Sequence, residues 1–388
     1  MFFRLIILPF LLVVISADAQ PTSSYFFASK QCSDSVADRL RTIIHQTIQL
    51  PLNEVTEAKW TSACWAMELM LHRLAEMQGL IPQHLQQLPK ESASFQRSYL
   101  EMVYTLYPGL FYKEVQSILP VLTHEKVRAM AWEYIIAAAP EADYTKDLAF
   151  RSSRYYVPFH TQRTKNVRKL PLINDFTDQS FLPGQTVLCS FQYADRNKPG
   201  FLMIRSADGA WLRNEKGKTL QFPQLARSVT NLPYYLTNGN TPQGLYKITG
   251  MGISSNQWIG PTANLQMELP FETGTSFFGT DSATLTSYKN LLGTKLEHYE
   301  GLYESYTAGM LGRSEIIAHG TTINPAFYLN EPYYPHTPSL GCLCSPEQWN
   351  EQGERIKSSQ QEWMQIYQSL QKKPMYLIVV EIEFAEKQ

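Results

Sequence analysis

The chain has 388 residues, of which 34 are basic, 35 are acidic, 44% are hydrophobic and 12% are aromatic. Because the charges nearly cancel, bulk electrostatics give no reason to expect a nucleic-acid partner, and we expect none. At roughly 100 to 200 residues per domain, the length predicts about two domains with a substantial core.

Residues 1–19 are predicted to form a secretory signal peptide. Arg4 precedes an apolar run over residues 5–15, and Ala17-Asp18-Ala19 gives a cleavage site of small residues. The apolar run is shorter than the roughly 20 residues that a membrane span needs. We therefore expect an exported protein.

Residues 20–150 are predicted to form an all-helical domain. Apolar residues recur there at intervals of three and four, and prolines fall at the expected helix ends. The expected helices cover residues 33–49, 57–78, 94–106, 110–119 and 124–138.

Residues 151–184 are predicted to be a basic and aromatic linker. Six basic residues and no acidic one lie between Arg151 and Lys169, interleaved with aromatic side chains. One interpretation is a surface for an anionic polymer or lipid head group. A solvated linker is the favoured interpretation, because charged runs without periodicity usually form loops.

Residues 185–388 carry the pattern of short strands and turns. Strands are expected over residues 186–189, 200–205, 210–213, 244–249, 264–269 and 375–384, with a helical excursion over 281–310. The chain is thus predicted to be an α+β protein, with the all-helical domain followed by a mainly antiparallel β domain that has helical excursions.

The five cysteines leave at least one thiol unpaired, and Cys342 is the natural candidate. Cys32 and Cys64 lie in the helical part and are able to pair. Cys189 lies in an apolar strand, which favours a buried and inert thiol.

A base and a nucleophile are predicted near the C-terminus. Residues 314–318 are expected to form a short strand that delivers His319, and Ser339-Leu340-Gly341 leads into Cys342. The amide groups of Gly341 and Cys342 are candidates to face an oxyanion. A helix expected from Pro346 would add a favourable dipole for a thiolate.

These residues resemble the catalytic domain of the L,D-transpeptidase family of bacterial cell-wall enzymes, whose hallmark is His-Gly followed by Ser-x-Gly-Cys. The segment Thr241-Pro242-Gln243-Gly244-Leu245-Tyr246 resembles the family's Thr-Pro-x-Gly-aromatic segment. A helix over 346–370 and a strand over 375–384 are expected in the family's order. Two features depart from the pattern: Cys344 replaces the usual Arg or Asn, and the interval from His319 to Cys342 is long.

The resemblance implies a cysteine acyltransferase of the periplasm or cell envelope that acts on peptidoglycan peptide stems. Cys342 would form a thioester with the stem tetrapeptide and release D-alanine, with His319 as the base. An amine acceptor gives an L,D crosslink, whereas water makes the protein an L,D-carboxypeptidase. Neither a cofactor nor a metal is implied. The residues expected to support the site are Gly320, Ser339 and Gly341, and those expected to bind substrate are Thr321, Thr322, Tyr333 and Tyr334.

Two other hypotheses belong to different classes of protein. Cys342, Cys344, His319 and His336 are four candidate zinc ligands, although Cys-x-Cys is tighter than the usual ligand spacing. Alternatively, a non-catalytic cell-wall binding protein would keep the fold while its helical domain binds a protein partner.

Overall fold

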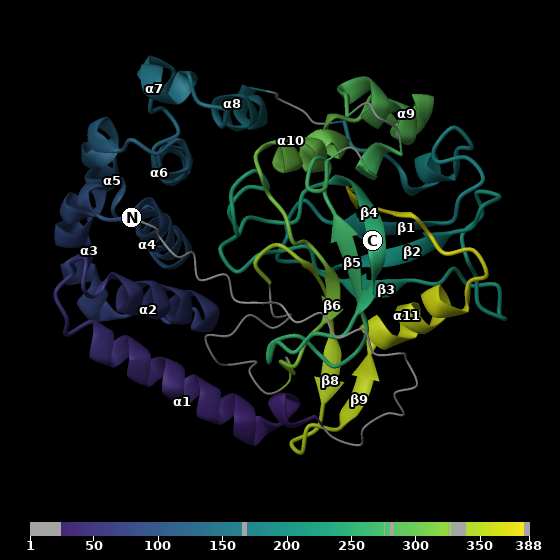
Figure 1. The fold of residues 1–388 in the computed structure, drawn as a ribbon, viewed down its shortest axis with the longest axis horizontal. Coiled ribbons are helices and arrows are strands. Elements are labelled where there is room, and N and C mark those ends of the chain that lie inside the picture. Colours follow the sequence, from purple (N-terminus) through teal and green to yellow (C-terminus); the bar gives the residue numbers. More distant parts are fainter. Residues whose placement is uncertain are drawn as a thin grey trace, which may run out of the picture.

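The structure is a computed structural model that describes residues 25–164, 169–274, 276–279, 283–324, 326 and 339–383. It contains both helices and a mixed sheet, so the predicted α+β class is confirmed. Figure 1 shows α1 to α8 gathered on one side of the molecule and the main sheet, with α9 to α11, on the other. Within the described residues, no helix is both long enough and apolar enough to cross a membrane.

Helices make up the chain before the first strand, with short 3-10 turns between some of them. Two of these helices begin at a serine whose hydroxyl accepts a backbone N–H of the first turn: Ser29 accepts from Cys32, and Ser92 accepts from Phe95. The helices are α1 (Lys30–Thr47), α2 (Glu57–Met70), α3 (Ala75–Gln87), α4 (Ala93–Leu106), α5 (Tyr112–Ile118), α6 (Glu125–Ala138), α7 (Leu148–Arg151) and α8 (Tyr156–Thr164).

The single helix expected over residues 57–78 is wrong, because the chain forms two helices there. Helix α2 ends at Met70, and Leu71 adopts the left-handed conformation with φ of 49°. A left-handed cap is usually a glycine, so a leucine in this role leaves no signal in the sequence.

The segment expected to be a solvated linker is partly helical and partly buried. Tyr155 is 1% exposed and Phe159 is fully buried, and both join the apolar cluster of the helical region. Tyr155 directly precedes α8 and Phe159 lies within it, and their four-residue spacing puts both side chains on one face. The segment is therefore amphipathic, although its many basic residues made it resemble a loop in the sequence. Residues 165–168 lie outside the described part of the chain.

The main sheet of the described residues has eight strands in the order β3-β2-β1-β10-β4-β5-β6-β7. The pairs β1·β10 and β6·β7 are parallel, and the other neighbours are antiparallel. The expected strand over 210–213 makes only isolated bridges. The strands are β1 (Val187–Gln192), β2 (Gly200–Arg205), β3 (Phe222–Gln224), β4 (Gly244–Gly252), β5 (Asn264–Glu268), β6 (Ala318–Gly320), β7 (Leu343–Ser345) and β10 (Tyr376–Glu381).

Helices cover both faces of this sheet. Alternate residues of β1 and β10 enter two different apolar clusters, as the period of two in a strand requires. One cluster includes residues of α9 (Leu285–Leu296), and the other includes residues of α11 (Ser359–Ser369). The helical excursion also contains α10 (Glu304–Met310). Strand β10 lies in the middle of the sheet, in agreement with its continuous apolar run.

The helix expected from residue 346 is wrong in its first half. A hairpin of β8 (Glu347–Trp349) and β9 (Arg355–Ser358) precedes α11. Tertiary contacts determine this hairpin: the buried Glu347 carboxylate accepts hydrogen bonds from Thr262 and Ser358, and the Trp349 indole N–H donates to the Thr321 carbonyl.

The helical half (described residues 25–164) and the sheet half (described residues within 169–383) share one apolar cluster. Leu232, Tyr235, Leu236, Leu311 and Ile323 pack with the side chains of the helices. The start of α1 is also attached to the β8–β9 hairpin, because Lys30 N–H donates to the Glu351 carbonyl at 3.1 Å. Tyr25, just before α1, also lies near Trp349 of β8, with ring centroids 6.4 Å apart. The two halves therefore pack as one body.

We expect Leu236→Ala to lower the free energy of unfolding by about 2–5 kcal/mol, because it opens a cavity in the shared cluster. Leu236 is fully buried, whereas Leu172 is 64% exposed and serves as the matched control. Urea unfolding of both variants measures the difference. An equal effect of the two substitutions would contradict the shared cluster.

Candidate active site

The parallel pairing of β6 with β7 brings the predicted base and nucleophile together. His319 lies opposite Cys344, and Ala318 lies opposite Leu343. Cys342 directly precedes β7, and since side chains alternate along a strand, it shares a face with Cys344 and hence with His319. Strand spacing and rise put the Cα atoms of His319 and Cys342 about 8 Å apart.

His319 lies inside β6 rather than at the end of a strand over 314–318, so that expectation is wrong. The side chain is 5% exposed, and its Nδ1 lies 2.7 Å from the Gly320 carbonyl oxygen. A carbonyl only accepts hydrogen bonds, so Nδ1 carries the proton and Nε2 carries the lone pair. Burial lowers the pKa of His319, which is therefore neutral at neutral pH.

The Cys342 thiol is partly exposed and has two backbone neighbours. The Ile317 N–H donates to Sγ at 3.5 Å, and the Glu315 carbonyl oxygen lies 3.6 Å from Sγ. Burial raises the pKa of Cys342, which outweighs the lowering by the Ile317 N–H and by the Arg313 charge. The expected helix dipole is absent, since β8 follows instead. In the resting protein the Cys342 thiol and the His319 imidazole are thus both neutral.

A hydrogen-bonded turn over residues 339–342, the Cys342 turn, positions Cys342. The Ser339 hydroxyl donates to the Cys342 carbonyl at 2.8 Å and accepts from the Gly341 N–H at 3.1 Å. The Thr241 hydroxyl donates to the Gly341 carbonyl at 2.9 Å. The Gly341 N–H is therefore engaged within the turn. The Cys342 N–H has no acceptor among the residues that the structure describes, and this leaves it as the candidate oxyanion donor.

Glycine is required at both ends of the His-to-Cys interval. A Cβ on Gly341, whose φ is 117°, would lie 2.3 Å from Arg313 Nη2 and 2.7 Å from the Gly239 carbonyl oxygen. A Cβ on Gly320 would lie 2.1 Å from Glu347 Oε2. Gly320 thus allows the close approach of the buried Glu347 carboxylate.

Arg313 is a residue of the site that sequence reasoning missed. Its guanidinium is buried and donates to the carbonyl oxygens of Asn240 at 2.8 Å and Gly239 at 3.0 Å. Burial lowers its pKa to about 10, so it remains charged. Its charge favours the thiolate of Cys342. The sequence gives no sign that Arg313 lies near Cys342, because the two come together only when the chain folds and the Cys342 turn packs against the Arg313 side chain.

The remaining predicted residues separate into two groups. Thr321 and Thr322 are buried, and their hydroxyls bond within the protein, to the Ile323 N–H and to the Gln257 carbonyl respectively. Both hydroxyls thus have a partner within the protein, and substrate binding by the two threonines stays a prediction. The predicted Tyr333 and Tyr334, and the candidate ligand His336, lie outside the described residues.

All five cysteines are free thiols, so Cys32 and Cys64, which were candidates for a disulfide, are not paired in the structure. Cys189 is fully buried, and burial raises its pKa to about 12, as an inert thiol requires. Among the residues that the structure describes, His, Cys, Asp and Glu side chains form no group of three able to hold a metal ion.

Comparisons of this chain with protein-family models, with curated proteins and with solved structures found no match.

We expect Gly341→Ala to lower the free energy of unfolding by about 1–3 kcal/mol more than Gly217→Ala, because the added methyl group overlaps Arg313. Gly217 also has a positive φ, of 75°, but open space where its Cβ would lie, so it controls for backbone strain alone. Thermal and urea unfolding measure both costs. Equal costs would mean that the turn does not lie against Arg313.

Proposed function

We propose that this protein is an exported cysteine acyltransferase of the L,D-transpeptidase type, acting on the peptide stems of peptidoglycan. The observation that carries the proposal is the Cys342 thiol on the same sheet face as His319, whose Nδ1 is held by the Gly320 carbonyl. A nucleophile beside a base that a third group orients is the arrangement that covalent acyl transfer uses.

The Thr-Pro-x-Gly segment supports the same proposal through its contacts. Thr241 bonds to the turn before Cys342, and the Tyr246 hydroxyl donates to the Pro242 carbonyl at 2.7 Å. A Cβ on Gly244 would lie 2.3 Å from the Leu302 carbonyl oxygen, so the close packing requires glycine. The segment thus fixes the backbone against which the Cys342 turn packs. We propose residues 185–388 as a mainly antiparallel catalytic domain and residues 20–150 as an all-helical domain that precedes it.

The proposed reaction has two steps. Cys342 Sγ attacks the carbonyl of the L-centre of the stem diamino acid while Nε2 of His319 accepts the thiol proton. The Cys342 N–H stabilises the oxyanion, and the imidazolium returns the proton to the departing amine of D-alanine. An amine of a second stem then takes the acyl group from the thioester and regenerates the thiol. Water in place of that amine gives the carboxypeptidase reaction.

We expect Cys342→Ala to abolish acyl-enzyme formation with a tetrapeptide donor, because no nucleophile remains. His319→Ala should slow formation by about 10²- to 10⁴-fold, the usual contribution of general acid–base catalysis. Cys344→Ala is the matched control, since Cys344 is 1% exposed and should not react. Intact-protein mass spectrometry detects the thioester.

Two outcomes would contradict the proposal: an acyl-enzyme in Cys342→Ala, or no acyl-enzyme in the unmodified chain. Mass analysis of the released muropeptides then separates crosslinked dimers, which a transferase makes, from trimmed tripeptides, which a carboxypeptidase makes.

The rate of acyl-enzyme formation should fall as the pH falls through the pKa of His319. Burial lowers this pKa below its usual value of about 6.5, and only the neutral imidazole accepts a proton. The half-maximal rate should therefore lie below about pH 6.5. A single-turnover pH profile measures it. A half-maximal rate above about pH 8 would show that prior ionisation of the thiol limits the reaction.

A further inference from the structure

A cavity of about 480 Å³ lies between the helical and sheet halves, and its lining residues do not include those of the Cys342 turn. Its volume is in the range of small-molecule sites. Its walls come from one face each of α1, α2 and α4 and from two loops of the sheet half. The lining residues on which the argument rests are Thr61, Trp65, Glu68, Glu101, Asn238 and Trp258.

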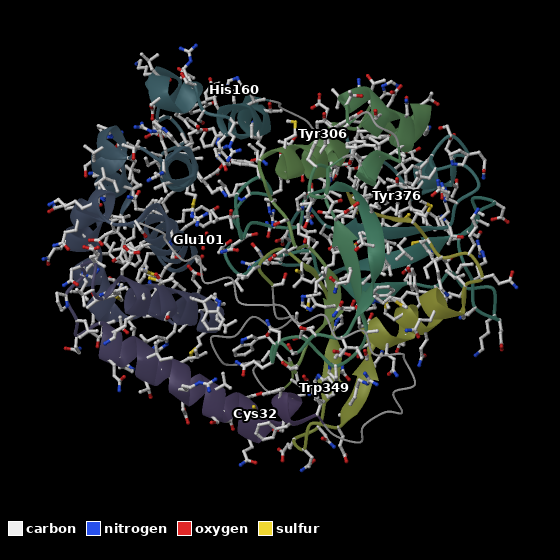
Figure 2. The ribbon with its side chains drawn as sticks, viewed as in Figure 1. Cys32, Glu101, His160, Tyr306, Trp349 and Tyr376 are labelled. Carbon is white, nitrogen blue, oxygen red and sulfur yellow. The ribbon has the colours of Figure 1, made fainter. Side chains whose placement is uncertain are left out.

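Two buried carboxylates line the cavity. Glu68 is 4% exposed and Glu101 is 5% exposed. Among the residues that the structure describes, Glu68 Oε1 has no hydrogen-bond partner, and neither carboxylate forms an ion pair. The Glu101 carboxylate accepts one hydrogen bond, from Asn238 Nδ2 at 3.0 Å. Figure 2 shows Glu101 on the side of the helical half that faces the sheet half.

Burial is costly for a carboxylate, and the charges of Arg97 and Lys126 offset that cost only in part at Glu101, while Arg39 also lines the cavity. Burial raises the pKa of Glu68 well above its usual value and that of Glu101 to about 7. The pair therefore provides two buried carboxyl groups, whose burial favours the protonated form, and an oxygen without a partner inside a cavity.

Two aromatic side chains complete the site. Trp65 of α2 and Trp258 of the sheet half meet edge to face, with ring centroids 6.2 Å apart. Thr61, Trp65 and Glu68 follow each other at helical spacing, so one face of α2 presents a hydroxyl, an indole and a carboxylate to the cavity. Indole rings accommodate methylene chains and attract cations.

We propose that this cavity is a binding site for a small organic molecule that carries a primary ammonium group on an aliphatic chain. The ammonium group has three donors for Glu68 Oε1 and its neighbours, and the chain lies along Trp65 and Trp258. The proposal does not depend on the acyltransferase proposal, since it uses no residue of the Cys342 turn.

The size and chemistry of the cavity argue against other ligands. A bare metal ion would leave most of the volume empty, since a water molecule occupies only about 30 Å³ of liquid. An organic cation fills the volume and pairs with a buried carboxyl group, which gives up its proton when the cation binds.

Isothermal titration calorimetry of the purified full chain with 1-aminopentane tests the proposal. 1-Pentanol has the same chain without the charge, and chitobiose represents a glycan. We expect 1-aminopentane to bind one to one and the other two to bind at least about tenfold more weakly. Absence of binding by 1-aminopentane, or tighter binding of chitobiose, would overturn the proposal.

Variants locate the binding. Glu68→Gln should weaken 1-aminopentane binding by at least about tenfold, whereas Glu76→Gln on the exposed face of α3 should leave it unchanged. Ser98→Leu fills the cavity without changing charge and should also abolish binding, which keeps the test decisive if Glu68→Gln does not fold. Unchanged affinity in a folded Glu68→Gln or Ser98→Leu variant would overturn the proposal.

Discussion

The candidate site depends on one constraint, the parallel pairing of β6 with β7. Residues 319 and 342 are separated by a long interval of chain. The backbone hydrogen bonds between β6 and β7 set the register that relates them. A shift of this register by one residue would put Cys342 on the face opposite His319, because side chains alternate along a strand. The Leu343 N–H to Ile317 carbonyl bond, at 3.0 Å, extends the ladder to the residue next to the nucleophile.

The edge strand β7 has support beyond its pairing with β6. Cys344 exchanges backbone hydrogen bonds with Leu225, at 2.8 and 2.9 Å. Ser339 forms a parallel bridge with Ser228. The same loop region continues to Leu232, Tyr235 and Leu236, which pack into the cluster shared with the helices. The helical half therefore stabilises the loop against which the Cys342 turn packs. No residue of the helical half takes part in the proposed chemistry.

Periodic patterns predicted those elements that local sequence determines. The strand over 200–205 and the helices over 94–106 and 124–138 were predicted to within a residue at each end, because caps and prolines mark them. The hairpin β8–β9 was not predictable in this way. Its residues resemble the start of a helix, and only the burial of Glu347 and Trp349 against distant partners makes them strands.

The site was predicted in the same uneven way. Residue type and local motif pointed to His319, Cys342, Ser339 and Gly341, and the fold places His319 on β6 and the other three in the turn that leads into β7. Arg313 and the carboxylate of Glu347 were missed, since their proximity to the site follows from tertiary packing. Thr321 and Thr322 were assigned to the substrate because a threonine beside a base suggests a contact, but their hydroxyls bond to the protein itself.

The neutral resting state of Cys342 has a consequence for its chemical durability. Peroxides and other oxidants react with thiolates far faster than with thiols, so susceptibility to sulfenic acid formation follows thiolate character. Because burial raises the pKa of Cys342, the sulfur holds its proton in the resting protein. A thiol of this kind withstands an oxidising environment without a reducing system to restore it.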